Sequence, residues 1–240
     1  MPFRKALSFD SPAPCDTCPI LEDSLCLPLP EKQRNGVRCM ARGRLVPQGQ
    51  PIFEEGEEVG FFASILTGVV KLFRAVPGKP AQIVTFLYPP QFLGYTSGDV
   101  HRYSAAATTE VELCIYPRSD FHSMLEESGG LRRKMLEKTD QDLELAREWV
   151  VMLSRKSSYQ RVAGIIAIFA QRTQRKAGTN LRFFLPVSRA DLAAYLGMTL
   201  ETVSRNITIL RQKRLIELRS TREVVVPHIE SLLAEADMLN

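Results

Sequence analysis

The stretch SRADLAAYLGMTLETVSRNITILRQ, residues 188–212, has the pattern of two short helices joined by a tight turn. Ser188 is followed three residues later by Asp191, which is the arrangement of a helix N-cap with a capping box. Gly197 supplies the left-handed residue that commonly ends a helix, and Thr199 is a suitable N-cap for the next one. Because two short helices joined by a glycine-containing turn form a helix-turn-helix, the stretch predicts that motif.

Apolar residues at helical spacing support both helices. In the first helix Leu192, Ala193 and Leu196 fall on one face. The residues expected to point inward from the second helix are Leu200, Val203, Ile207 and Leu210.

The outer face of the second helix carries the information about function. It presents a continuous polar stripe at helical spacing, made of Glu201, Ser204, Arg205, Thr208 and Gln212. Arg can bind guanine with two hydrogen bonds, Glu can accept one from cytosine, and Ser adapts to several bases. Since phosphates repel a carboxylate, Glu201 belongs on a DNA-facing surface only if it contacts a base. We therefore expect Glu201, Ser204 and Arg205 to contact bases in the major groove, the alternative being an ordinary solvated helix face.

A wing is expected after these helices, with strands at Leu215–Leu218 and Val224–Val226 around a basic turn. Basic and hydroxyl side chains near the helices and the turn are expected to contact phosphates, an affinity that weakens with salt. The predicted phosphate contacts are Ser188, Arg189, Thr199, Thr202, Thr208, Arg211, Arg219 and Arg222.

Charge is distributed unevenly along the 240 residues. Residues 155–240 hold 14 Lys and Arg against 7 Asp and Glu, a net charge of +7, whereas residues 1–154 carry a net charge of −3. A basic last third suggests a polyanion partner, although a solvated basic face gives the same count. The sequence has no apolar run long enough to cross a membrane and no secretory h-region near Met1, so we expect a cytoplasmic protein that does not engage membranes.

The remaining sequence predicts an α+β chain of four parts. Residues 1–40 form a proline-rich arm that bears cysteines, and residues 41–117 contain short β-rich runs such as Val69–Val76, Gln82–Tyr88 and Val111–Tyr116 between glycines. Short strands with regular turns indicate an all-β roll or barrel. Residues 118–154 have a helical period, and residues 155–240 form the helix-turn-helix domain.

A heptad pattern runs through the predicted helix of residues 118–154. Its a and d positions are Leu136, Thr139, Leu143, Ala146, Val150 and Leu153. So narrow an apolar stripe, flanked by dense charge, favours a two-helix dimer seam. The alternative is a helix packed on its own β domain.

Cysteines cluster in the arm, where Cys15, Cys18 and Cys26 lie within twelve residues. Thiols clustered in a reducing compartment bind a metal or act in redox chemistry more often than they form disulfides. A four-thiolate site needs one more ligand, and Cys114 is the best candidate. The apolar residues of Val111–Tyr116 alternate, which places Cys114 on the opposite face with Tyr116. Spacing alone leaves an iron–sulfur cluster, a zinc knuckle, a metal-free thiol switch and, for Cys114, a small buried hydrophobe as alternatives.

The run Leu200-Glu-Thr-Val-Ser-Arg205 resembles the recognition-helix signature of the CRP/FNR superfamily. Its Glu-x-x-Ser-Arg form is similar to that of the FNR branch, because the CRP branch has Gly where Ser204 stands. The resemblance covers nearly the whole chain. It implies a cyclic-nucleotide-binding-like β-roll (a jelly roll), a long dimerisation helix and a C-terminal winged helix-turn-helix. It also implies a homodimer that works with RNA polymerase on double-stranded DNA operators with palindromic TTGAT half-sites.

The same resemblance implies a cofactor. Regulators of the FNR branch that sense oxygen hold a [4Fe-4S] cluster on three N-terminal cysteines and one distal cysteine, the places that Cys15, Cys18, Cys26 and Cys114 occupy. The seven residues between Cys18 and Cys26 differ from the five of the best-known member and resemble the FnrN/FnrL-like group. Cys39 has no role in the pattern. Because the dimer helix is expected to start just after Pro117, we expect loss of the cluster in oxygen to release the arm and misalign the seam.

Other classes fit less well. Related cyclic-nucleotide sites have a Gly-Glu pair where this chain has Gly94-Tyr95, so no cyclic nucleotide is expected. The sequence has no haem-binding motif. His101, His122 and His228 are isolated from one another and are expected on the surface or in turns. No catalytic motif is present, and the Cys-x-x-Cys of a thiol oxidoreductase needs a βαβ setting that the arm does not offer, so an enzyme is not expected.

Overall fold

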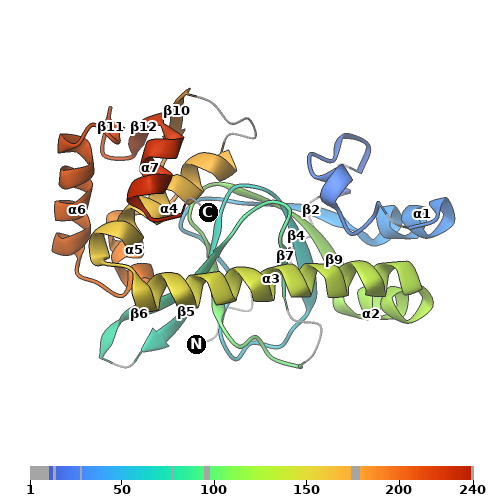
Figure 1. Ribbon diagram of the computed structural model, residues 1–240. Helices are drawn as coiled ribbons and strands as arrows, with labels where there is room; N and C mark the ends of the chain where they lie inside the picture. The colour runs from blue at the N-terminus through green and yellow to red at the C-terminus, as the bar shows by residue number, and fades with distance from the viewer. Residues whose placement is uncertain are drawn as a thin grey trace. The chain divides into compact units, whose positions relative to one another are not determined.

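The computed structural model describes residues 11–12, 15–27, 29–76, 78–94, 98–173 and 179–238. These form two compact units (Figure 1), one from Met1–Arg74 and Val84–Asp142 and the other from Ala75–Ile83 and Leu143–Asn240. The predicted β-roll, long helix and winged helix-turn-helix are all present. Within the described ranges no helix has the length and apolar character needed to traverse a membrane.

The β-roll consists of two antiparallel sheets with strand orders β1-β2-β9-β4-β7 and β3-β8-β5-β6. The first sheet contains β1 (Ser11–Pro12), β2 (Arg42–Val46), β9 (Val111–Pro117), β4 (Phe61–Thr67) and β7 (Phe92–Leu93). The second contains β3 (Pro51–Phe53), β8 (Ser104–Ala107), β5 (Val70–Val76) and β6 (Lys79–Leu87). The runs predicted to be strands are therefore β5, β6 and β9.

Strand β9 is buried on both faces. Val111, Leu113 and Ile115 point into the core of the roll, while Cys114 and Tyr116 belong to a second apolar cluster. The predicted alternation is confirmed, and Cys114 is 8% exposed. The second face is covered by apolar residues of the arm, of α2 (Arg118–Glu127) and of α3 (Gly129–Arg155). The arm contains η1 (Cys15–Thr17), η2 (Leu21–Asp23) and α1 (Glu31–Met40).

The prediction of a single helix over residues 118–154 is wrong in one respect, because the segment is divided into α2 and α3. Ser128 separates them with an extended backbone, and its hydroxyl accepts a hydrogen bond from the Leu131 amide. Gly129 and Gly130, both weak helix formers, follow it. From Gly129 onward α3 is one continuous helix of 27 residues (Figure 1).

The second unit is a winged helix-turn-helix built on α4 (Ser158–Thr173). It contains β10 (Thr179–Phe184), α5 (Arg189–Leu196), α6 (Leu200–Gln212), β11 (Glu217–Leu218), β12 (Glu223–His228) and α7 (Ile229–Glu235). The wing has three strands in the order β10-β12-β11, so β10 adds to the two predicted from the sequence. The last helix begins only at Ile229, because Pro227 and His228 continue β12.

The histidines depart in part from expectation. His101 is buried rather than on the surface, and its ring stacks on Phe53 with centroids 3.6 Å apart. Burial lowers the pKa of His101 below its usual value, which favours the neutral ring.

The C-terminal part of α3 is fastened to the helix-turn-helix by two stacked rings. The Trp149 and Tyr195 centroids lie 4.1 Å apart, with the ring planes inclined by 9°. Such pairs stabilise a fold by about 0.5–1.5 kcal/mol beyond the area they bury. Trp149 is the chain's single tryptophan, so its fluorescence reports on this contact.

We predict that Tyr195→Leu lowers the free energy of unfolding by about 1 kcal/mol and changes the emission of Trp149, as measured by denaturant titration. Phe184→Leu is the matched control, since Phe184 is exposed on β10 and its loss should change stability by less than about 0.5 kcal/mol. Equal effects of the two substitutions would show that the stack contributes nothing.

Candidate nucleic-acid interface and cysteine site

The turn between α5 and α6 has the capping geometry predicted from the sequence. The Ser188 hydroxyl accepts a hydrogen bond from the Asp191 amide at 3.0 Å and donates one to the Asp191 carboxylate at 2.7 Å. Gly197 ends α5 in the left-handed conformation, with φ 63° and ψ 41°. Thr199 then accepts a hydrogen bond from the Thr202 amide and caps α6. These local bonds fix where the second helix begins, and so which side chains it presents.

Helix α6 has one buried face and one polar face. Val203, Ile207 and Leu210 are buried as predicted. Leu200 was predicted to point inward and is instead 51% exposed. It is the first residue of α6, and side chains lean toward the N-terminus of a helix, so Leu200 extends past the end of the core. Asn206 is also buried. The sequence did not indicate this burial, because the side chain of Asn206 is polar.

The predicted base-contacting residues lie together on the polar face of α6. Glu201 and Arg205 are exposed and Ser204 is half-buried. Thr208, one turn further on, donates its hydroxyl proton to the Ser204 carbonyl and so continues the stripe without crowding it. The structure thus brings one carboxylate, one hydroxyl and one guanidinium to the first two turns of an exposed helix.

The predicted phosphate contacts lie on the helix-turn-helix and the wing. Arg189, Arg211 and Arg222 carry the positive charge outside the recognition stripe, and Arg211 and Arg222 are exposed. The hydroxyls of Ser188 and Thr199 are engaged in the two caps. Arg219 forms an ion pair with Glu217 at 2.7 Å.

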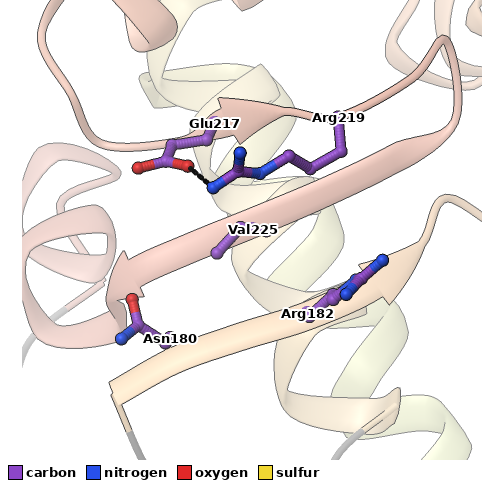
Figure 2. A pocket seen from close by; sticks show the side chains of 5 residues that line it. All are labelled: Asn180, Arg182, Glu217, Arg219 and Val225. Atoms are coloured by element: carbon purple, nitrogen blue, oxygen red, sulfur yellow. Dashed lines mark hydrogen bonds and ion pairs between the residues drawn. The ribbon is translucent and has the colours of Figure 1, made fainter.

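The wing holds a further arginine that sequence reasoning missed. Arg182 on β10 and Arg219 line one shallow hollow on the outer face of the sheet, together with Asn180, Glu217 and Val225 (Figure 2). Arg182 also pairs with Glu223 of the neighbouring strand. In the sequence Arg182 stands between apolar Leu181 and Phe183, an alternation that indicates a strand with Arg182 on its exposed face. No strand was predicted there from the sequence, so Arg182 was not identified.

The cysteine site joins the arm to β9. Cys15, Cys18 and Cys26 are half-buried on the arm, and Cys114 is buried on the strand. Cys18, Cys26 and Cys114 belong to one apolar cluster, and Cys15 and Cys18 both raise the pKa of Cys26 and of Cys114. The side chain of Cys39 is not among those the structure describes.

The electrostatics of the site keep its inner thiols protonated. Burial, followed by the neighbouring cysteines, raises the pKa of Cys26 to about 11. Burial raises the pKa of Cys114 to about 12, and the three arm cysteines act in the same direction. A hydrogen bond from Tyr116 opposes both shifts. Such thiols ionise at neutral pH only when a bound metal cation stabilises the thiolate and displaces the proton.

Small residues flank Cys114 in the sheet. Its cross-strand neighbours are Gly43 on β2, which has no side chain, and Ser64 on β4, whose side chain falls on the same face of the sheet as Cys114. A buried glycine within a strand commonly marks a place where another group approaches closely. In the part of the chain that the structure describes, no three His, Cys, Asp or Glu side chains form a group able to hold a metal ion. The thiols are therefore gathered around one region but not drawn onto a single point.

The predicted seam on α3 is an exposed apolar stripe. Leu136 is 62% exposed, Leu143 48% and Val150 65%. Thr139 and Ala146 are also exposed, while Leu153 is half-buried. Large apolar side chains repeated in this way along one helix indicate a surface that another chain covers.

Comparison with known proteins identifies the family. A model of the Crp-like helix-turn-helix domain matches residues 160–235, and a model of the cyclic nucleotide-binding domain matches residues 44–128. A probable transcriptional activator from Rhizobium leguminosarum bv. viciae is 32% identical over 222 residues, which cover 92% of this chain and 92% of that protein. The transcriptional activator protein FnrL of Cereibacter sphaeroides is 31% identical over 226 residues, 92% of this chain and 91% of FnrL. The chain belongs to the FNR branch of the CRP/FNR superfamily.

The structure agrees with this assignment. This CRP/FNR protein superimposes on the solved structure of FixK2 from Bradyrhizobium japonicum with a TM-score of 0.73 and 27% identity, over 81% of this chain and 96% of FixK2. Together with the helix-turn-helix geometry, the relatives identify a DNA-binding transcription activator and not an enzyme.

Two serines of this CRP/FNR protein allow the capping and DNA-contacting roles to be separated. We predict that Ser188→Ala lowers the free energy of unfolding by about 1 kcal/mol, because the capping hydrogen bonds are lost. Ser204→Ala should leave stability within about 0.5 kcal/mol but weaken binding to target DNA about fivefold. Thermal unfolding and a DNA titration by fluorescence anisotropy measure the two effects. A Ser204→Ala protein with unchanged DNA affinity would contradict the assigned face.

Proposed function

We propose that this protein is an oxygen-responsive transcription regulator in which Cys15, Cys18, Cys26 and Cys114 hold a [4Fe-4S] cluster that controls dimerisation and operator binding. The observation that carries the proposal is the convergence of the four thiols. Three come from the arm and one from the central strand β9, far away in sequence. Cys18, Cys26 and Cys114 pack in one apolar cluster, and Cys15 lies near enough to raise the pKa of Cys26 and of Cys114.

The donor set fits such a cluster. Iron–sulfur clusters are held by cysteine thiolates, and the arm and β9 together offer four free cysteines. Ligands of a polynuclear cluster stand further apart than those of a single ion, which suits thiols gathered around a common region. When bound, the cluster would supply a redox centre that oxygen can attack. The high pKa values of Cys26 and Cys114 also argue against a metal-free thiol switch, because protonated thiols react slowly.

Packing offers a route from the cysteines to the dimer helix. Cys18, Cys26 and Cys114 pack in the same apolar cluster as Phe121 of α2 and Leu131 of α3. The arm contributes Ile20, Leu25, Leu29 and Val37 to that cluster. We infer that loss of the [4Fe-4S] cluster would free the arm and remove these apolar contacts. The start of α3 would then be less firmly held. The coupling is a shift in population between dimer-competent and incompetent states.

The exposed stripe of α3 and the polar face of α6 suggest two partners, a second copy of the chain and an operator DNA. Two copies would pair along Leu136, Leu143 and Val150, with Thr139, Ala146 and Leu153 completing the seam. Each copy would place Glu201, Ser204 and Arg205 against one half-site of a TTGAT-N4-ATCAA palindrome, so protein and operator share a two-fold axis. We expect the phosphate contacts named above, a contact with RNA polymerase and no cyclic nucleotide, since the sequence has Tyr95 where a ribose-binding carboxylate is needed.

We predict that Cys114→Ala abolishes both the visible absorption of anaerobically purified protein and its anaerobic binding to TTGAT-N4-ATCAA, measured by gel shift. The parent should bind that duplex better than a scrambled one without oxygen and lose the preference in air. Cys39→Ala is the matched control and should retain colour and binding.

Three results would contradict parts of the proposal. Retained colour and binding in Cys114→Ala would refute the fourth ligand. A colourless parent that contains zinc and binds DNA equally in air would replace the cluster by a structural metal site. A pure, iron-replete parent with no preference for the palindrome would refute the operator assignment.

We predict that Leu143→Asp makes the anaerobic protein monomeric in analytical ultracentrifugation and weakens operator binding at least tenfold (about 1.4 kcal/mol), because it buries a charge in the seam. Leu145→Asp is the control, since Leu145 is also an exposed leucine of α3 but lies outside the a and d positions. If both variants stay dimeric, the dimer must form elsewhere.

A further inference from the structure

Two cationic side chains lie where α3 ends and α4 begins. Lys156 follows the last residue of α3, and Arg161 lies near the start of α4. Both side chains are half-buried, and both donate hydrogen bonds to backbone carbonyls. We call Lys156 and Arg161 the junction pair. They belong to the same compact unit as the helix-turn-helix.

Arg161 joins the ends of two helices. Its Nε atom donates a hydrogen bond to the carbonyl of Lys156 at 3.0 Å, and its Nη1 atom donates one to the carbonyl of Leu196 at 3.2 Å. Leu196 is the last residue of α5. The last carbonyls of a helix have no partner within the helix, and they form the negative end of its dipole, which favours a cation. One planar guanidinium therefore fastens α5 to the end of α3.

Lys156 makes the corresponding contact with α7. Its Nζ atom donates hydrogen bonds to the carbonyls of Ala236 at 2.7 Å and of Asp237 at 2.5 Å. Ala236 is the C-cap of α7. The junction pair therefore contacts carbonyls at the C-terminal ends of α3, α5 and α7.

The stack of Trp149 on Tyr195 acts at the same place, because Tyr195 directly precedes Leu196. The last turn of α5 is thus held to α3 by a ring contact and through Arg161. Gly197 then makes the turn into α6. Whatever fixes the end of α5 consequently fixes the start of the recognition helix.

We propose that the junction pair positions the helix-turn-helix on the end of α3, so that pairing along α3 sets the distance between the two recognition helices of a dimer. Arg161 is the central positioning residue and does not itself contact DNA. The inference rests on the dimer seam and the palindromic operator proposed above, and it adds the part that links them. In dimeric helix-turn-helix proteins the spacing of the half-sites follows from the geometry of the protein. A loosened junction would leave each recognition helix intact and lose the register between the two.

The test compares binding at two half-sites with binding at one. Full-length Arg161→Lys keeps the charge but replaces the planar fork that spans two carbonyls by one ammonium on a flexible stem. The variant, purified without oxygen, should remain dimeric in analytical ultracentrifugation. In fluorescence anisotropy it should bind the TTGAT-N4-ATCAA duplex about five times more weakly than the parent, as expected when one hydrogen bond is lost. Its affinity for a duplex with a single TTGAT half-site should be unchanged.

Trp149 gives a second measurement that needs no DNA. Because its ring stacks on Tyr195, it reports on how firmly the last turn of α5 is held. Acrylamide should therefore quench the fluorescence of Trp149 more strongly in Arg161→Lys than in the parent.

Two further variants complete the test. Arg147→Lys is the matched control, since Arg147 is an exposed arginine of α3 that pairs with Glu144 at 3.2 Å, and it should change neither measurement. Lys156→Met removes the other cation of the junction pair and should shift both measurements in the same direction as Arg161→Lys. It also decides the matter if Arg161→Lys fails to fold.

The outcomes are distinct. An Arg161→Lys protein with the parent's preference for two half-sites over one would overturn the role of the junction pair and leave the operator assignment intact. Equal weakening on both duplexes would show that Arg161 contacts DNA, which overturns that role as well. A parent with no preference for the palindrome over a scrambled duplex would refute the operator assignment instead. The quenching of Trp149 then decides, because equal quenching in parent and variant would overturn the junction pair without any use of DNA.

Discussion

Burial of strand β9 on both faces is the constraint on which the first unit depends. One face, with Val111, Leu113 and Ile115, closes the core of the β-roll. The other, with Cys114 and Tyr116, is apolar enough to need a cover, and the arm together with Phe121 and Leu131 supplies it. Because a strand alternates its side chains, a single seven-residue segment holds the roll, the arm and the start of the helices together.

The same burial determines the chemistry of the cysteines. A cysteine thiol in water ionises at moderately alkaline pH. In this protein desolvation raises the pKa of Cys26 to about 11 and that of Cys114 to about 12. Deprotonation therefore requires an external positive charge, so a bound metal centre would contribute directly to holding the arm on the strand.

The DNA-binding unit is stabilised differently. Its α5–α6 turn is set by short-range hydrogen bonds of Ser188 and Thr199, which fix where α6 begins and which side chains form its polar face. The Trp149–Tyr195 stack fastens the end of α3 to this unit.

The sequence alone determined the local features. The capping box, the Gly197 turn, the polar stripe of α6 and the facing of Cys114 rest on hydrogen bonds or periodicities within a few residues, so a short window encodes them. Only the tertiary structure decided that both faces of β9 are buried, that Tyr116 packs in the same apolar cluster as Cys26 and Cys114, that Ser128 divides the helix and that Leu200 is exposed. These depend on which distant segments pack together and where each core ends, and no local pattern carries that information.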